Sequence, residues 1–173
     1  EYSFLINTNF ESPIYKIDLA YHQNAFVKIK NNSQGVIAFE FIQNTNENFF
    51  DFKNEDIFLL TYNGSSYWQH FIQDTVPFIS LFYDFLKENP SIIMIMSPPY
   101  FDYFKIFMPS LHLKNKVLLV NENVILKTTG KIYFSDIHTT RELYLSEYPM
   151  SLYKNSMPLI TSSISSFFHF QND

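Results

Sequence analysis

The sequence contains no cysteine, only three glycines and a single arginine, Arg141. Without cysteine the chain cannot form a disulfide framework or a zinc site built from thiolates. A formal net charge of −5 together with one arginine argues against a nucleic-acid partner, which requires clustered Lys and Arg to neutralise phosphates. No apolar run reaches the roughly 18 residues that a membrane-spanning helix requires.

The scarcity of glycine also bears on nucleotide binding. Neither the pattern GxGxxG nor the pattern GxxxxGK[ST] occurs in the chain. The loops that most often hold phosphate groups with backbone N–H donors are therefore missing from it.

Aromatic and aliphatic residues are abundant instead. The chain has 173 residues, of which 46% are hydrophobic, and it includes 20 Phe and 12 Tyr. This length and composition suit one folded domain with a sizeable core and argue against disorder. Asn, Ile, Phe, Tyr and Lys have AT-rich codons, so an AT-rich source genome is expected, which raises the aromatic content without a functional reason.

The order of apolar runs predicts two segments. Residues 1–50 are predicted to form a β-rich N-terminal element, with strand-like runs at 14–19, 25–30 and 36–42. Residues 51–173 are predicted to form a Rossmann-like half-domain that is incomplete at its C-terminus. Its predicted elements are buried strands at 57–62, 92–96 and 116–120, helices at 66–86 and 100–113, a hairpin or two short strands over 124–135, and a helical stretch at 139–153. The alternation of strand and helix predicts an α/β fold with neighbouring parallel strands.

The helix predicted over residues 66–86 has clear boundary signals. Ser66 and Gln69 form a capping box at its start, and the stretch KENP at 87–90 ends it. At 100° per residue, one largely apolar face gathers Trp68, Phe71, Ile72, Thr75, Ile79, Phe82 and Leu86. This face is predicted to pack against the sheet.

His70 and Asp74 lie four residues apart in this helix, on the side away from the apolar face. Side chains at i and i+4 of a helix are able to touch, and two interpretations of the pair are open. In the first, the pair is solvated on an exposed helix face. In the second, the positive end of the helix keeps the His70 imidazole neutral and able to accept a proton, while Asp74 holds the other ring nitrogen.

The stretch HFIQDTVPFI, residues 70–79, follows the pattern His, aromatic, aliphatic, any, acidic, any, aliphatic, Pro, any, aliphatic. In this pattern it resembles the motif helix of glycosyltransferase family 61, which includes plant xylan xylosyl- and arabinosyltransferases, animal GlcNAc transferases, and bacterial and viral relatives. The order of the surrounding strands is similar over most of residues 10–140. The family often has Asn three residues before the histidine, where this chain has Tyr67.

The resemblance implies an inverting glycosyltransferase that moves a sugar from a nucleotide-sugar to a hydroxyl of a glycan or glycoprotein acceptor. It implies a GT-B-type enzyme, of which this chain is the N-terminal, acceptor-side half, with a C-terminal donor-binding half expected. His70 is expected to act as the base or to position the acceptor, and Asp74 to orient it. Tyr67 and Gln69 are candidate substrate-binding residues. No cofactor is expected, and the compartment is the secretory lumen for a eukaryotic source or the cytoplasm for a bacterial or viral one.

Three further residues follow the last predicted strand. Asp136 and His138 either line the same crevice as His70 or solvate the end of a strand. Arg141 either binds a phosphate or carboxylate of the substrate or forms a surface salt bridge. No metal site is predicted, because two ligands at i and i+4 do not define one. The alternative function is a non-catalytic, Rossmann-like binding or interaction module.

Overall fold

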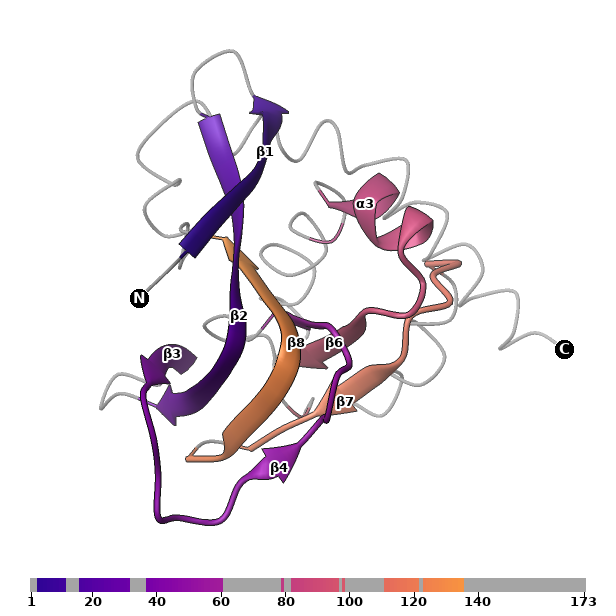
Figure 1. The fold of residues 1–173 in the computed structure, drawn as a ribbon. Coiled ribbons are helices and arrows are strands. Elements are labelled where there is room, and N and C mark those ends of the chain that lie inside the picture. The colour runs from indigo at the N-terminus through magenta and orange to yellow at the C-terminus, as the bar shows by residue number, and fades with distance from the viewer. Residues whose placement is uncertain are drawn as a thin grey trace, which may run out of the picture.

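The computed structural model describes residues 3–11, 16–31, 37–60, 79, 82–96, 98, 111–121 and 123–135. Across these ranges the strands form a single eight-stranded sheet, with the short helix α3 (Tyr83–Glu88) beside it (Figure 1). The strands are β1 (Ser3–Glu11), β2 (Lys16–Asn31), β3 (Ile37–Ile42), β4 (Phe50–Asp51), β5 (Ile57–Leu59), β6 (Ile93–Met96), β7 (Val117–Leu119) and β8 (Ile125–Ser135). Their order is β1-β2-β8-β5-β6-β7, with β3 also paired to β2 and β4 to β8.

One half of the sheet is parallel, as the apolar runs predict. Strand β5 pairs with β6 in parallel, with Ile57 opposite Ile93, and β6 pairs in parallel with β7, with Met94 opposite Val117. The prediction that these three runs form neighbouring parallel strands is confirmed. All residues of β5 and β6 are buried, which explains why both sequences are continuously apolar rather than alternating.

The predicted fold class is nevertheless wrong. The sheet is not the helix-covered parallel sheet of a Rossmann-like domain or of the N-terminal half of a GT-B enzyme, because β8 lies between β2 and β5 and pairs antiparallel with β2. Strands β1 and β3 are antiparallel to β2 as well. The result is a mixed sheet in which strands account for most of the described residues.

Strand β2 is longer than the sequence pattern predicts. Residues 16–19 of the first run and residues 25–30 of the second belong to one strand. The polar residues between them carry a register irregularity in the pairing of β2 with β8, between Gln23 and Ala25. Asn24 has φ 54°, a left-handed conformation that asparagine adopts more readily than most residues. The polar stretch thus bends the strand without ending it.

Strand β8 corrects the predicted hairpin or pair of short strands over 124–135. It is continuous from Ile125 to Ser135 and crosses the middle of the molecule beside β2 (Figure 1). Along its other edge it pairs in parallel first with β4, through Leu126, and then with β5, through Ile132. One long strand therefore connects the antiparallel half of the sheet with the parallel half.

The main core lies against one face of this sheet. Strands β2, β5, β6 and β8 and the connections after β4 and β7 contribute its residues, which are Val27, Ile29, Phe52, Ile57, Leu59, Ile93, Ile95, Val120, Leu126 and Ile132. On β2 the outward positions Lys28 and Lys30 alternate with the inward Val27 and Ile29, as expected for an antiparallel strand with one solvated face.

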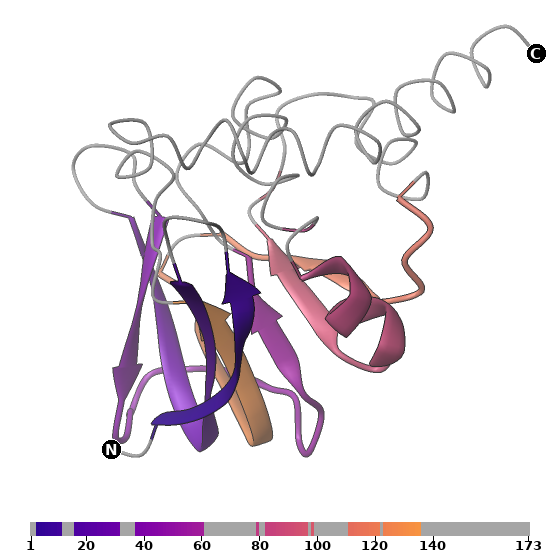
Figure 2. The same ribbon diagram turned by 90° about the horizontal axis from the view of Figure 1, so that it is seen from above.

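Helix α3 packs on the opposite face of the parallel half, where the Phe85 ring lies 6.5 Å from Phe58 of β5, and it lies beside β6 in Figure 2. The burial predicted for the apolar face is confirmed at its described members Ile79, Phe82 and Leu86, which are fully buried. One unbroken helix through this part of 66–86 is not observed, because Phe82 has a non-helical backbone with φ −101° and ψ 14°, and α3 begins after it at Tyr83. The predicted stop at 87–90 is also confirmed, since α3 ends at Glu88. The rest of the helix predicted over 66–86 and the stretch 139–153 lie outside the described residues, as does most of the helix predicted over 100–113, whose last three residues are not helical.

Candidate functional site

The candidate site is the edge of the sheet at which the parallel strands end. Strands β8, β5 and β6 are neighbours and run in the same direction, with Phe58 opposite Tyr133 and Leu59 opposite Ile95. The last residues of β5 and β8 therefore lie side by side. In open sheets with parallel strands, ligands bind beyond the carboxyl ends of the strands.

None of the sequence-predicted site residues lies among the described residues. This holds for Tyr67, Gln69, His70, Asp74, Asp136, His138 and Arg141. The structure does describe the ends of the two strands that precede these residues in the chain. Residues 61–78 follow β5, and residues 136 onward follow β8. The roles of the seven residues stay predictions.

A set of hydrogen bonds at the opposite end of β5 fixes its position against β8. The Thr129 N–H donates to the Lys53 carbonyl at 2.6 Å, and the Thr129 hydroxyl donates to the same oxygen at 2.8 Å. The Thr128 hydroxyl lies 3.2 Å from that carbonyl and also bonds the Glu55 carbonyl. Residues 53–55, which connect β4 to β5, are thereby tied to the middle of β8.

Gly130 belongs to the same contact. A Cβ atom at this position would lie 2.7 Å from the carbonyl oxygens of Asn54 and Glu55 and 2.7 Å from Asp56 Oδ1. Asp56 Oδ1 in turn accepts a hydrogen bond from the Lys131 N–H at 2.8 Å. Only glycine lets the connection approach β8 this closely, which explains a glycine inside a strand.

Aromatic side chains on the helix-covered face connect β5 and β8 to α3. The Phe58 ring lies 5.4 Å from Phe82 and 6.3 Å from Tyr133, and Phe85 meets Tyr133 edge-on at 5.2 Å. Burial, followed by the neighbouring Asp56 carboxylate and Tyr21, raises the pKa of the Tyr133 hydroxyl to about 12. Tyr133 thus stays protonated through the physiological range.

Polar groups around Tyr133 form a further set of contacts that no sequence motif predicts. Tyr21 lies 5.9 Å from Tyr133 between ring centroids, and the Lys131 ammonium lies 4.9 Å from the Tyr21 ring centroid. The residues come from β2, from β8 and from the position before β5, so no local motif relates them. Only the antiparallel pairing of Tyr21 with Tyr133 brings them together, and the sequence gives no signal of that pairing.

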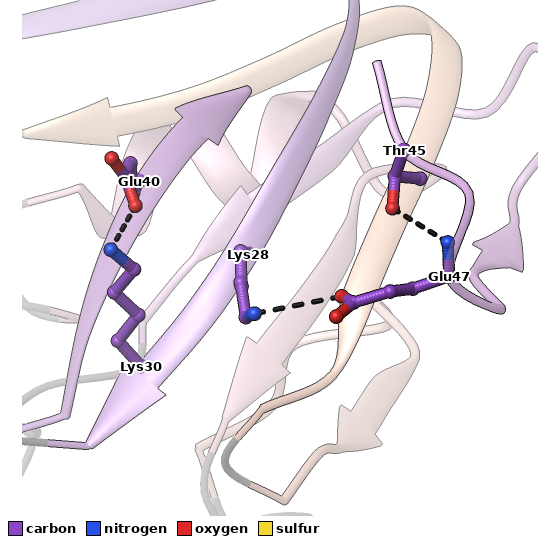
Figure 3. Close-up of polar contacts among 5 residues, drawn as sticks. All are labelled: Lys28, Lys30, Glu40, Thr45 and Glu47. Carbon is purple, nitrogen blue, oxygen red and sulfur yellow. Dashed lines mark hydrogen bonds and ion pairs between the residues drawn. The ribbon is translucent and has the colours of Figure 1, made fainter. Parts of the chain in front are cut away.

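The solvated face of β2 and β3 carries matched charges (Figure 3). Lys28 Nζ lies 3.5 Å from Glu47 Oε2, and Lys30 forms an ion pair with Glu40. The Glu47 N–H donates to the Thr45 hydroxyl at 2.9 Å, a local contact within the segment after β3, and the Lys28–Glu47 ion pair joins that segment to β2. Exposed pairs of this kind contribute about 0–1 kcal/mol each, so they shape the surface charge more than the stability.

The described part of the chain shows neither a membrane-spanning helix nor a metal-binding cluster. No helix in it is long and apolar enough to cross a membrane. No group of three or more His, Asp or Glu side chains in it lies close enough together to hold a metal ion.

Comparisons of the chain with models of protein families, with curated proteins and with solved structures find no match. The resemblance of residues 70–79 to glycosyltransferase family 61 therefore stays a prediction from the motif.

Proposed function

We propose that this chain is the acceptor-side part of an inverting glycosyltransferase. The parallel pairing of β8, β5 and β6 is the observation that supports the proposal. The segment with His70 and Asp74 continues from β5, and the segment with Asp136 and His138 continues from β8, so both start from one edge of the sheet. That edge is where parallel strands present ligand-binding segments.

In the proposed reaction an acceptor hydroxyl attacks the anomeric carbon of a nucleotide-sugar. His70 removes the hydroxyl proton as the new C–O bond forms, while the bond to the nucleotide diphosphate breaks on the opposite side and the configuration inverts. Asp74 orients the imidazole and stabilises the imidazolium. The diphosphate leaves with its negative charge and requires cationic or backbone donors, which the proposal assigns to the C-terminal donor-binding half.

The test measures release of nucleotide diphosphate from UDP- and GDP-sugars by the longest natural protein that contains this chain. His70→Ala is expected to lower kcat by about 10²-fold or more, because general-base catalysis typically contributes about 10²–10⁴-fold. Asp74→Asn keeps the shape, loses the charge and is expected to cost the same or less. Unchanged turnover in His70→Ala, or no transfer by the wild type with any donor, would contradict the proposal.

His112→Asn is the matched control for the histidine variant. His112 is exposed and has φ 58°, a conformation that asparagine tolerates well, so the substitution removes an imidazole without straining the backbone. Its turnover is expected to equal that of the wild type. A loss as large as that of His70→Ala would show that the assay responds to any lost histidine.

Donor binding provides a second test, on the 173-residue chain itself. Because the chain lacks a phosphate-cradling loop and a basic cluster, calorimetry with UDP-sugars is expected to show no binding in the micromolar range. Micromolar binding would mean that the donor site lies within this chain, which contradicts its assignment to the acceptor side.

The corrected fold favours a second candidate, a non-catalytic binding or interaction module. The mixed sheet exposes Phe49 and Phe50 beside β2 and β8, with 42% and 51% of their surface accessible. Such a module requires neither His70 nor a partner domain. The sequence that follows residue 173 in the natural protein discriminates between the two, since a further segment with basic residues near strand ends favours the enzyme and a stop codon favours the module.

A further inference from the structure

We draw no further inference here: the strongest candidate, the cluster of Tyr21, Asp56, Lys131 and Tyr133 side chains that β2, β8 and the residue before β5 bring together beside α3, rests only on the raised pKa of Tyr133, and nothing in the described part of the chain shows what its groups would bind.

Discussion

Gly130 shows how one residue holds two strands in register. Its Cα lies against two carbonyl oxygens and the Asp56 carboxylate, and a methyl group there would meet all three at 2.7 Å. Two of these atoms belong to the backbone and cannot rotate away. We expect Gly130→Ala to lower the free energy of unfolding by about 1–3 kcal/mol, the usual cost of overpacking, as measured by urea denaturation.

Thr129→Ala is the control for this prediction. It removes the exposed hydroxyl that bonds the Lys53 carbonyl and adds no atom, so its expected cost is about 0.5–1.5 kcal/mol. If Gly130→Ala is as stable as the wild type, residues 53–56 do not pack against β8 as described.

Tyr133 makes stability depend on pH in the alkaline range. Its pKa is about 12 in the folded protein and 10 in the unfolded chain, so the unfolded state loses its proton first as pH rises. The stabilising contribution is therefore complete below pH 10 and is lost as pH rises toward 12, by at most about 1.4 kcal/mol per pH unit. Urea denaturation across this range measures the slope.

Tyr133→Phe isolates the effect, because phenylalanine keeps the ring contacts with Phe58 and Phe85 and has no proton to lose. The variant is expected to lose less stability than the wild type on going from pH 10 to 12. Identical pH dependence in the two proteins would mean that Tyr133 titrates normally in the folded state.

At the scale of single residues, the sequence predicts which side chains of one element are buried, but it does not predict contacts between residues far apart in the chain. The apolar periodicity correctly places Ile79, Phe82 and Leu86 on the buried side. The group around Tyr133 escapes such reasoning because its members are far apart in the chain and are joined only by strand pairing. The candidate site falls between these cases: the spacing of His70 and Asp74 is visible in the sequence, and their geometry stays a prediction.

At the scale of elements, strands that are apolar throughout can be predicted from the sequence, whereas strands interrupted by polar or glycine residues cannot. Strands β5, β6 and β7 are short and uniformly apolar, so their existence and parallel pairing follow from the pattern. Strands β2 and β8 contain polar or glycine residues in their middles, which favour a turn in isolation. In the folded chain the polar residues of β2 form a bulge, and Gly130 of β8 lets residues 54–56 pack closely against the strand. Both strands continue through these positions.

A substitution in helix α3 tests how much the helix stabilises the parallel half of the sheet. Leu86 is fully buried, so Leu86→Ala removes apolar contacts and leaves a cavity. We expect a loss of about 2–5 kcal/mol in the free energy of unfolding. Glu88→Ala, at an exposed position of the same helix, is expected to stay within about 0.5 kcal/mol of the wild type. Equal, small effects in thermal or urea unfolding would mean that α3 does not pack on the sheet.

At the scale of the whole molecule, the central claim is that the N-terminal strands and the parallel strands share one sheet through β8. A parallel sheet with a separate β-rich element explains the apolar runs equally well. The choice depends on which strand lies beside β8, a long-range pairing that local sequence does not encode. The observed fold requires β2 to pair with β8 in the described register, whereas the predicted fold has no such pair. This pairing therefore decides between the two folds.

A single engineered disulfide tests that register most directly, and the absence of native cysteine keeps the experiment free of other thiols. Gln23 and Lys131 are antiparallel partners, and the Cα atoms of such pairs lie about 4.5–5.5 Å apart, within the range that a disulfide bridges. Lys127, four residues earlier on β8, lies about 13 Å further along the strand. The account predicts that Gln23→Cys/Lys131→Cys forms an intramolecular disulfide on mild oxidation, counted as lost free thiols by mass spectrometry, and that Gln23→Cys/Lys127→Cys does not. Free thiols in the first variant, or a disulfide in the second alone, would contradict it.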